Sequence, residues 1–301
     1  MGERTAQSLT GVGVYASTMT ATGIGPLLKE WRQRRSMSQV ALALQAQVSA
    51  RHLSFVETGR ARPSVEMVIT LAIHLDVPLR DRNELLLAAG FAPRYGETPL
   101  DAAAMDRVRS GVQRLLDAHD PYPGMVLDRH HDIVASNRSA RRFLATLPAA
   151  LSEPPINLFR ACLHPDGFSA DSANFESWAP QMLGQLDRMT VDCSDDVLSN
   201  LRAEVATYAN VTALDRRGTP GRTALPHELL VSSMFVIDGT ELSLFSTLTS
   251  FGSPRDITLD DLSIELFFPA DDHTHAALRG LCGSPSKSSF GPRRPQPPRL
   301  R

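Results

Sequence analysis

Residues 49–64, SARHLSFVETGRARPS, bring together side chains suited to binding a polyanion. Arg51 stands in the first turn of a short predicted helix, and a guanidinium can bond guanine O6 and N7 together. Arg60 and Arg62 follow in a Gly-Arg-Ala-Arg loop, where they suit phosphates. The pattern therefore predicts a helix whose start reads base edges and a loop that holds the backbone of double-stranded DNA.

The net charge of −2 conceals a basic segment and an acidic remainder. Residues 24–62 carry seven basic side chains against Glu30 and Glu57, whereas residues 63–282 sum to −12. The stretch 283–301 is again basic, with a net charge of +5. This asymmetry favours an anionic partner for the N-terminal region alone, because the acidic remainder would be repelled by the same polyanion.

The region 24–90 is predicted to form five short helices. Pro26 suits the first turn of the first helix, and Gly90 is a natural stop for the fifth, which runs from about Leu79 to Ala89. Three serines are placed to cap the helices between them: Ser38, Ser49 and Ser64. Short connections between these helices indicate a compact all-α domain.

The second and third helices have the spacing of a helix-turn-helix, which leaves the start of the third helix exposed. Leu53 and Val56 would fix that helix against its partner. Gln39, in the preceding helix, could hold a phosphate or an adenine edge. The predicted DNA-contacting residues are Gln39, Ser49, Ala50, Arg51, His52, Ser54, Phe55, Arg60 and Arg62. The alternative is that Arg51 and His52 only solvate an exposed helix of a bundle.

The remainder of the chain mixes strand and helix signals, which predicts an α+β domain. MVLDRHHDIVASNRSARRFL indicates strand, turn, strand, then Asn137 leading into a helix. Asp238-Gly239 is a hairpin signal between two longer strands. Thr258 and Asp261 suggest a variant capping box for a helix over 259–268.

The expected organisation has five parts. They are a disordered leader (1–22), the helix-turn-helix domain (23–91), a linker (92–100), the α+β domain (101–282) and a disordered, basic, Pro-rich tail (283–301).

Apolar side chains of the α+β domain could line a ligand pocket, although an ordinary core position is the favoured interpretation for each. The apolar candidates are Phe143, Phe159, Leu163, Phe235, Phe245, Phe267 and Phe268. Arg160 and His164 could meet a carboxylate head group; alternatively, Arg160 pairs with Asp166 and His164 caps locally. Asn137 is a further candidate, for which a hydrogen bond to backbone at the strand-to-helix turn is the alternative.

Neither a metal site nor a catalytic site is predicted. Two clusters of acidic and histidine residues could ligate a metal, but solvated turns are favoured for both. In the first cluster, adjacent histidines on a strand would point to opposite faces and could not easily converge. These clusters are Asp128, His130, His131 and Asp132, and Asp271, Asp272, His273 and His275. The three cysteines fit no zinc or disulfide spacing, and no hydrolase, P-loop or zincin motif is present. No long apolar run or signal peptide pattern is found, so we expect a cytoplasmic protein without a membrane partner.

The segment SQVALALQAQVSARHLSFVETGRARPSVEMVITLAIHLDVP resembles the Cro/repressor-type helix-turn-helix of the XRE family. The shared pattern is S-Q, A, V-S, L-S, E-x-G and P-S in register, before a long amphipathic helix. The family usually has Gly where Gln47 stands, and often where Ser36 stands. A left-handed Gln47 costs on the order of 1 kcal/mol. The resemblance implies sequence-specific DNA binding, and a dimer is expected because one short helix buries too little surface.

Further segments resemble the MmyB-like regulators, in which an XRE-type domain is joined to a PAS-like ligand-binding domain. They are PLRDRNELLLAAGFAPRYGETPL, PPINLFRACLHPDGF and LSLFSTLTSFGSPRDITLDDLSIELFFPADD. His131 stands where that family commonly has Trp. The resemblance implies a bacterial transcriptional regulator with a small-molecule effector, a fatty acid or another small apolar ligand.

The expected function is therefore a dimeric, operator-binding regulator with a sensing domain. Two alternatives stay open. In one, the regulator is constitutive and its second domain only dimerises. In the other, the second domain binds a metal or is an enzyme, and the helical domain is an interaction module.

Overall fold

The computed structural model describes residues 23–192, 195–216, 230–237 and 239–283. The chain forms two compact units. The first, called the head, runs up to Glu97 and includes Arg255–Asp260, and the second, called the body, holds residues 98–254 and those from Asp261 onward. The predicted leader (1–22) and nearly all of the predicted tail lie outside the described residues.

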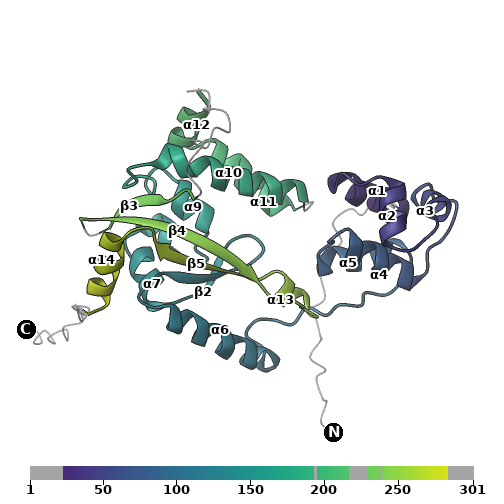
Figure 1. The fold of residues 1–301 in the computed structure, drawn as a ribbon, viewed down its shortest axis with the longest axis horizontal. Coiled ribbons are helices and arrows are strands. Elements are labelled where there is room, and N and C mark those ends of the chain that lie inside the picture. The colour runs from purple at the N-terminus through teal and green to yellow at the C-terminus, as the bar shows by residue number, and fades with distance from the viewer. Residues whose placement is uncertain (1–22, 193–194, 217–229, 238, 284–301) are drawn as a thin grey trace, which may run out of the picture. The chain divides into compact units, whose positions relative to one another are not determined.

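The head contains the five predicted helices (Figure 1). They are α1 (Ile24–Arg34), α2 (Gln39–Gln45), α3 (Ala50–Glu57), α4 (Val65–His74) and α5 (Leu79–Ala88). Ser38 accepts a hydrogen bond from Ala41 N at 3.0 Å, and Ser64 accepts one from Met67 N at 3.2 Å. Gly90 ends the series at a φ of 87°, a left-handed conformation that suits glycine. The prediction of an all-α domain of five short helices is confirmed.

The core of the head forms where α1 meets α3. Leu28 and Leu53 are fully buried there. Gly25 lies so close to the end of α3 that a Cβ at this position would sit 2.5 Å from the Glu57 carbonyl oxygen. The absence of a side chain at Gly25 therefore permits the two helices to approach, and the packing fixes the orientation of α3.

A short helix from far along the sequence completes the head. In α13 (Ile257–Asp260), Asp260 Oδ2 accepts a hydrogen bond from Leu79 N at 2.6 Å. This carboxylate caps α5, whose own N-cap residue, Pro78, supplies no side-chain bond. Ile257 N also donates to Gly96 O at 2.8 Å. The β4–β5 connection thus contributes a structural part of the head.

The body is built on a five-stranded antiparallel sheet in the order β2-β1-β5-β4-β3. The strands are β1 (Gly124–Leu127), β2 (Ile133–Ser136), β3 (Ser233–Ile237), β4 (Thr240–Ser250) and β5 (Ser263–Pro269). The predicted strand, turn, strand and helix after Asn137 are present. Ile237 pairs with Thr240 across the predicted hairpin turn, with Gly239 at a φ of 75°, while Asp238 lies outside the described residues. The α+β class is confirmed.

The predicted helix over 259–268 is wrong. Helix α13 ends at Asp260, and most of the predicted span belongs to β5. The sequence SIELFFP alternates its side chains between the two faces of the sheet, and β5 pairs with both β1 and β4. Sheet pairing therefore overrides the weak capping signal at Thr258 and Asp261.

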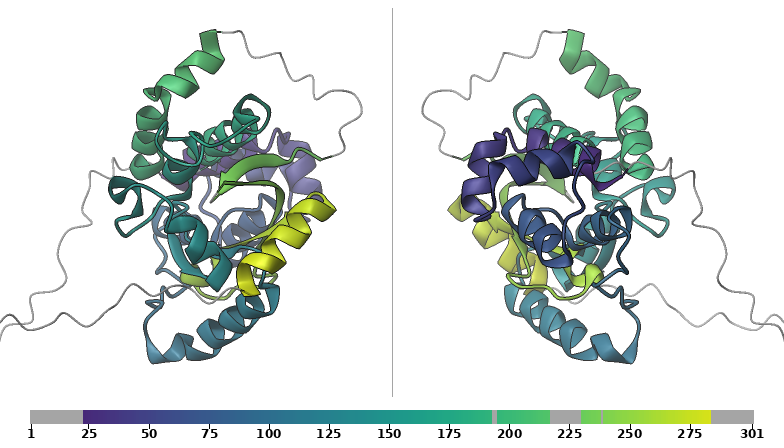
Figure 2. Two further views of the ribbon diagram at one scale, coloured as in Figure 1. Left: turned by 90° about the vertical axis from the view of Figure 1, so that its left-hand side faces the viewer. Right: turned by 90° about the vertical axis from the view of Figure 1, so that its right-hand side faces the viewer.

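Helices surround the sheet. They are η1 (Ala103–Met105), α6 (Asp106–His119), α7 (Arg138–Leu144), α8 (Ala149–Ser152), α9 (Leu158–Leu163), α10 (Phe175–Asp192), α11 (Asp196–Ala206), α12 (Ala209–Arg216) and α14 (Asp272–Gly283). Figure 1 shows α10 beside β3, and Figure 2 shows α14, in yellow, lying across the long strand β4. None of the helices in the described ranges combines the length and apolar character needed to span a membrane.

Candidate DNA interface and ligand pocket

The start of α3 is held in place by one cap and two buried anchors. Ser49 accepts a hydrogen bond from His52 N, at 3.4 Å, and is itself exposed. Leu53 and Val56 are fully buried against the core of the head. Because these anchors occupy the inner face, Arg51 and His52 are exposed on the outer face of the first turn.

Arg51 is supported by an aromatic ring one turn later. Its guanidinium carbon lies 5.4 Å from the centre of the Phe55 ring, a cation–π arrangement. Phe55, Ser54 and Ala50 are half-buried. Stacking on Phe55 restricts the Arg51 side chain while leaving its N–H groups available to an outside acceptor, as a base-reading arginine requires.

The loop after α3 presents two more arginines. Gly59 adopts a φ of 73°, and Arg60 N donates to Phe55 O at 2.7 Å, which closes the helix. Arg60 and Arg62 are both exposed. The structure thus brings these two predicted phosphate contacts next to the helix that carries Arg51.

Gln39 is engaged inside the head. Its amide nitrogen donates to Glu57 Oε2 at 2.8 Å. Glu57 also pairs with Arg32 through two bonds of 2.7 and 2.8 Å, and Arg32 donates to Met37 O. Burial alone would raise the pKa of Glu57, but the bonds from Arg32 and Gln39 hold it below its ordinary value. Gln39 therefore positions α2 against α3, and DNA contact by its remaining carbonyl stays a prediction.

Left-handed backbone occurs at interhelical positions of the head, including the two where the XRE resemblance raised a question. Gln47, in the turn between α2 and α3, has a φ of 53°, and Ser36 has the same value. These are the positions at which the XRE pattern has glycine. Val48 N donates to Ala43 O at 2.9 Å, so the turn is closed even with Gln47 in this strained conformation.

The body contains a pocket of about 450 Å³ between α10 and the sheet. Helix α10 contributes one face, at helical spacing: Trp178, Gln181, Met182, Gln185 and Arg188. The strands contribute Ser233, Phe235, Leu244, Phe245, Ser246, Glu265 and Phe267. The lining is completed by Leu158 and Cys162 of α9, His131 of the β1–β2 turn, and Leu230 and Val231 before β3. The volume is within the usual range for small-molecule sites.

Three ionisable groups of the pocket are shifted toward their neutral forms. Burial lowers the pKa of His131 to about 4, although nearby Asp132 opposes the shift. Burial raises the pKa of Glu265, with a hydrogen bond to Ser246 acting against it. Burial also raises the pKa of the Cys162 thiol. The pocket therefore disfavours charge in its interior.

The predicted pocket aromatics are divided between sites. Phe235 lines the pocket, and so do Phe245 and Phe267. Phe143 lines a smaller apolar cavity of about 40 Å³. Phe159 is fully buried and stacks against His131, with ring centres 4.8 Å apart.

Phe268 and Leu163 do not line the pocket of about 450 Å³. Phe268 stacks on Phe245 at 5.4 Å, and Leu163 is fully buried in the core.

Asn137 is fully occupied by the backbone around it. Its Oδ1 accepts hydrogen bonds from Ala140 N at 2.9 Å and Gly124 N at 3.1 Å. Its Nδ2 donates to Leu116 O at 3.2 Å and Tyr122 O at 2.7 Å. These four bonds join α6, β1 and α7, and they support the structural alternative for Asn137.

Arg160 and His164 are not brought to the pocket. Arg160 forms a bidentate pair with Glu204 of α11, with bonds of 2.7 to 3.1 Å. His164 packs edge-on against Tyr208 at 4.9 Å, and its Nδ1 accepts from Asp166 N at 3.1 Å. The partner proposed for Arg160 from the sequence, Asp166, is replaced by Glu204. A carboxylate head group in the pocket would not meet either side chain.

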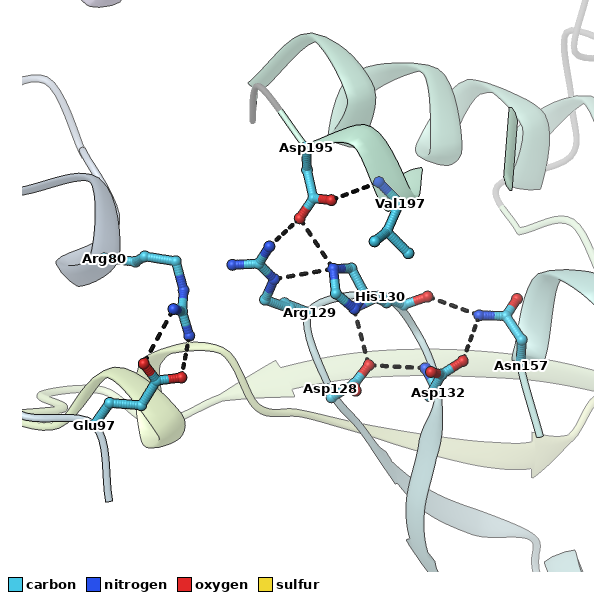
Figure 3. Close-up of polar contacts among 9 residues, drawn as sticks. All are labelled: Arg80, Glu97, Asp128, Arg129, His130, Asp132, Asn157, Asp195 and Val197. Atoms are coloured by element: carbon cyan, nitrogen blue, oxygen red, sulfur yellow. Dashed lines mark hydrogen bonds and ion pairs between the residues drawn. The ribbon is translucent and has the colours of Figure 1, made fainter. Parts of the chain in front are cut away.

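The β1–β2 turn carries a polar network (Figure 3). Asp195 caps α11 by accepting from Val197 N at 2.8 Å, and it pairs with Arg129 and with His130 Nε2. Asp128 accepts from His130 N at 2.8 Å. Among the described residues, no group of three or more His, Cys, Asp or Glu side chains is placed to hold a metal ion. The network instead ties the turn that carries the neighbouring His131 to α11.

Trp178, Gln185, Arg188 and Glu265 are among the pocket residues that the sequence analysis does not indicate. Glu265 falls within the predicted helix over 259–268, which hides its inward position on β5. The i, i+3, i+4 and i+7 spacing of Trp178, Gln181, Met182 and Gln185 is present in the sequence and could have located the face that α10 contributes.

The head exposes a capped helix start with flanking arginines, and the body contains a pocket of small-molecule size. Together they define a class: DNA-binding regulators with a small-molecule domain. The MmyB-like transcription regulator ligand binding domain model matches residues 108–281, and a helix-turn-helix model matches residues 28–81. The first match covers more than half of the chain, so the protein belongs to the family with the MmyB-like transcription regulator ligand binding domain. No curated protein matches the chain. Both matched families are regulatory rather than enzymatic.

Proposed function

We propose that the protein is a sequence-specific transcriptional regulator that binds a (pseudo)palindromic operator as a homodimer and responds to a small amphipathic effector in the body. The observation that carries the proposal is the pairing of an exposed, stacked Arg51 at the start of α3 with a pocket of about 450 Å³ in the same chain. Because its partner would be chromosomal DNA, we place its action in the cytoplasm.

Base reading by Arg51 is the sharpest part of the proposal. Selection from a pool of random duplexes would define the operator, and fluorescence anisotropy would then give affinities for it and its single-base variants. Arg51→Ala should cost about 1–3 kcal/mol at the operator and relax one base position. The matched variant Arg60→Ala removes a phosphate contact, so it should weaken all sequences alike and reduce the salt slope. Equal loss on every sequence for Arg51→Ala would reject base reading, and unchanged affinity would reject contact there.

Dimerisation is proposed because a single short recognition helix buries too little surface for specific affinity. Two heads on one operator require half-sites about one helical turn apart, or a multiple of this spacing. Native mass spectrometry of the full chain with and without the selected operator tests this directly. A two-to-one protein-to-duplex complex is expected. A one-to-one complex at saturating protein would overturn the two-half-site arrangement.

The proposed effector site is the pocket, whose apolar walls suit a fatty-acyl or similar apolar chain. The route to the head is the β4–β5 connection. Both strands line the pocket, and the segment between them, Arg255–Asp260, belongs to the head and caps α5 through Asp260. A ligand that binds two arrangements of β4 and β5 with different affinity would shift the head between two states.

The alternative of a constitutive regulator is less well supported. It would fit best with a body whose interior is filled by core side chains, whereas α10 and the sheet leave room for a ligand. Native mass spectrometry of protein purified from its own host distinguishes the two. An adduct of small-molecule mass that is displaced on operator binding supports sensing. A bare dimer that binds the operator with full affinity would support constitutive regulation.

A further inference from the structure

The polar side of the pocket has an unusual composition for a site that would take an anion. Among the described residues that line it, Arg188 is the only Lys or Arg, and it is exposed on α10. The other polar side chains of the lining include the hydroxyls of Ser233 and Ser246, the amides of Gln181 and Gln185, the imidazole of His131 and the carboxyl group of Glu265. Of these, His131 and Glu265 are ionisable, and Gln185 contacts His131. The chemistry of these three groups determines which polar ligand atom the interior can accept.

His131 carries a ring nitrogen without a partner. The residue is 6% exposed, and its ring is held between Phe159 and Gln185. The Gln185 amide nitrogen lies 3.0 Å from Nε2, so with the amide as donor the proton of the neutral ring resides on Nδ1. Nδ1 is buried and has no hydrogen-bond partner among the described residues. A buried, unpaired N–H is costly, and a ligand oxygen would satisfy it.

Glu265 supplies a second donor when it is protonated. It projects from β5 into the pocket, beside Ser246 of β4. Burial raises the pKa of Glu265, which favours the uncharged acid, and that acid has one O–H to donate. Its place on β5 follows from the strand register, in which Glu265 and Phe267 share the face toward α10.

These donors discriminate between ligand head groups. A carboxylate placed near Glu265 would put two acids in one desolvated site, which penalises ionisation of both. Among the lining residues that the structure describes, exposed Arg188 is the one Lys or Arg available to offset that penalty. An uncharged carbonyl oxygen needs only donors, and it would accept from His131 and Glu265 without any charge being buried. The apolar walls would take the rest of the molecule.

We propose that the effector is an uncharged amphipathic molecule, an apolar chain ending in a carbonyl group such as an amide, ester or lactone, with the carbonyl oxygen bound by His131 and Glu265. This rests on the proposed role of the pocket as the effector site. It deepens that role by assigning the head group and by separating it from a free fatty acid, which has the same chain with a charged end.

The test is a chain-matched pair of probes, decanamide and decanoate, titrated calorimetrically into the full-length, delipidated protein at pH 7. Wild type should bind decanamide at least about tenfold more tightly than decanoate. This factor corresponds to the free energy of one buried hydrogen bond that the amide makes and the charged carboxylate does not. Glu265→Leu should weaken decanamide about tenfold, whereas Glu265→Gln, which keeps a donor, should retain most of the affinity. His131→Asn should also weaken decanamide, and asparagine suits the left-handed φ of 62° at this position.

The overturning results are equally specific. Decanoate binding as tightly as decanamide, or more tightly, overturns the proposal, and loss of that binding in Arg188→Gln would assign a carboxylate head held by arginine. Glu265→Leu with unchanged decanamide affinity also overturns it, provided that thermal unfolding shows an intact body. If neither probe binds, the head-group proposal fails. Operator binding and host-purified adducts, measured separately, then decide whether the proposed regulator function survives.

Discussion

The buried pair of Arg32 and Glu57 permits a quantitative test of what holds α3 in its presenting orientation. Arg32→Met removes bonds of 2.7 and 2.8 Å and leaves the Glu57 side chain, which is 1% exposed, with Gln39 as its remaining side-chain hydrogen-bond donor. Leaving one member of a buried pair typically costs about 3–5 kcal/mol. A domain has about 5–15 kcal/mol in total, so the head should lose much of its stability.

The double variant Arg32→Met/Glu57→Leu separates the worth of the pair from the cost of an orphaned charge. It removes both charged groups, and replacing a buried ion pair by apolar residues is often neutral or stabilising. We therefore expect the double variant to recover most of the loss seen in Arg32→Met. The coupling energy follows from the complete cycle with Glu57→Leu.

Tryptophan emission makes the measurement specific to the head. The chain has two tryptophans, Trp31 in α1 and Trp178 in α10. In a Trp178→Phe background, urea unfolding followed by fluorescence reports on the head alone. An Arg32→Met head within about 1 kcal/mol of the parent would refute the reasoning from burial. So would a double variant less stable than the single one.

Three further predictions concern Asn137, Asp260 and Glu57. In urea unfolding, Asn137→Ala should lower the free energy of unfolding of the body by at least about 3 kcal/mol, because it removes the hydrogen-bond partner of four backbone groups. Asn137→Asp should cost less, since both bonds to the side-chain oxygen survive. Asp260→Ala should lower head stability by about 1 kcal/mol, whereas Asp260→Asn, which can still cap α5, should lose only part of that. Because the pKa of Glu57 is lowered in the folded head, the stabilisation by its ionised form is complete above the ordinary pKa and is lost as pH falls through the lower folded value. Glu57→Gln should therefore make the stability of the head less dependent on pH in that acidic range.

The head could be predicted almost completely from the sequence because its signals are local. Ser38, Ser49 and Ser64 each cap the helix that immediately follows, and Gly90 ends the last one. The part of the head that the sequence did not predict depends on a residue far along the chain. Nothing near Pro78 indicates that a carboxylate 181 residues away supplies the cap of α5.

The pocket was harder to predict because it depends on register and on pairing between distant strands. Phe235, Phe245 and Phe267 were candidates for which an ordinary core position was favoured, and they line the pocket. Glu265 was missed because a capping signal was preferred to the alternation in SIELFFP. Arg160 was given a ligand role because its partner, Glu204, is far along the chain and could not be foreseen.

The contacts of Arg255–Asp260 set a scale for an allosteric effect. The hydrogen bonds that tie this segment to the rest of the head include those from Leu79 N to Asp260 and from Ile257 N to Gly96 O. At about 1 kcal/mol each, their release would be worth about 2 kcal/mol, or roughly thirtyfold in operator affinity for one head. Two heads on one operator could multiply this to about a thousandfold. A much larger ligand effect on operator affinity would have to draw on further contacts, such as the burial of Ile257 in the same segment or the direct chain passage after Glu97.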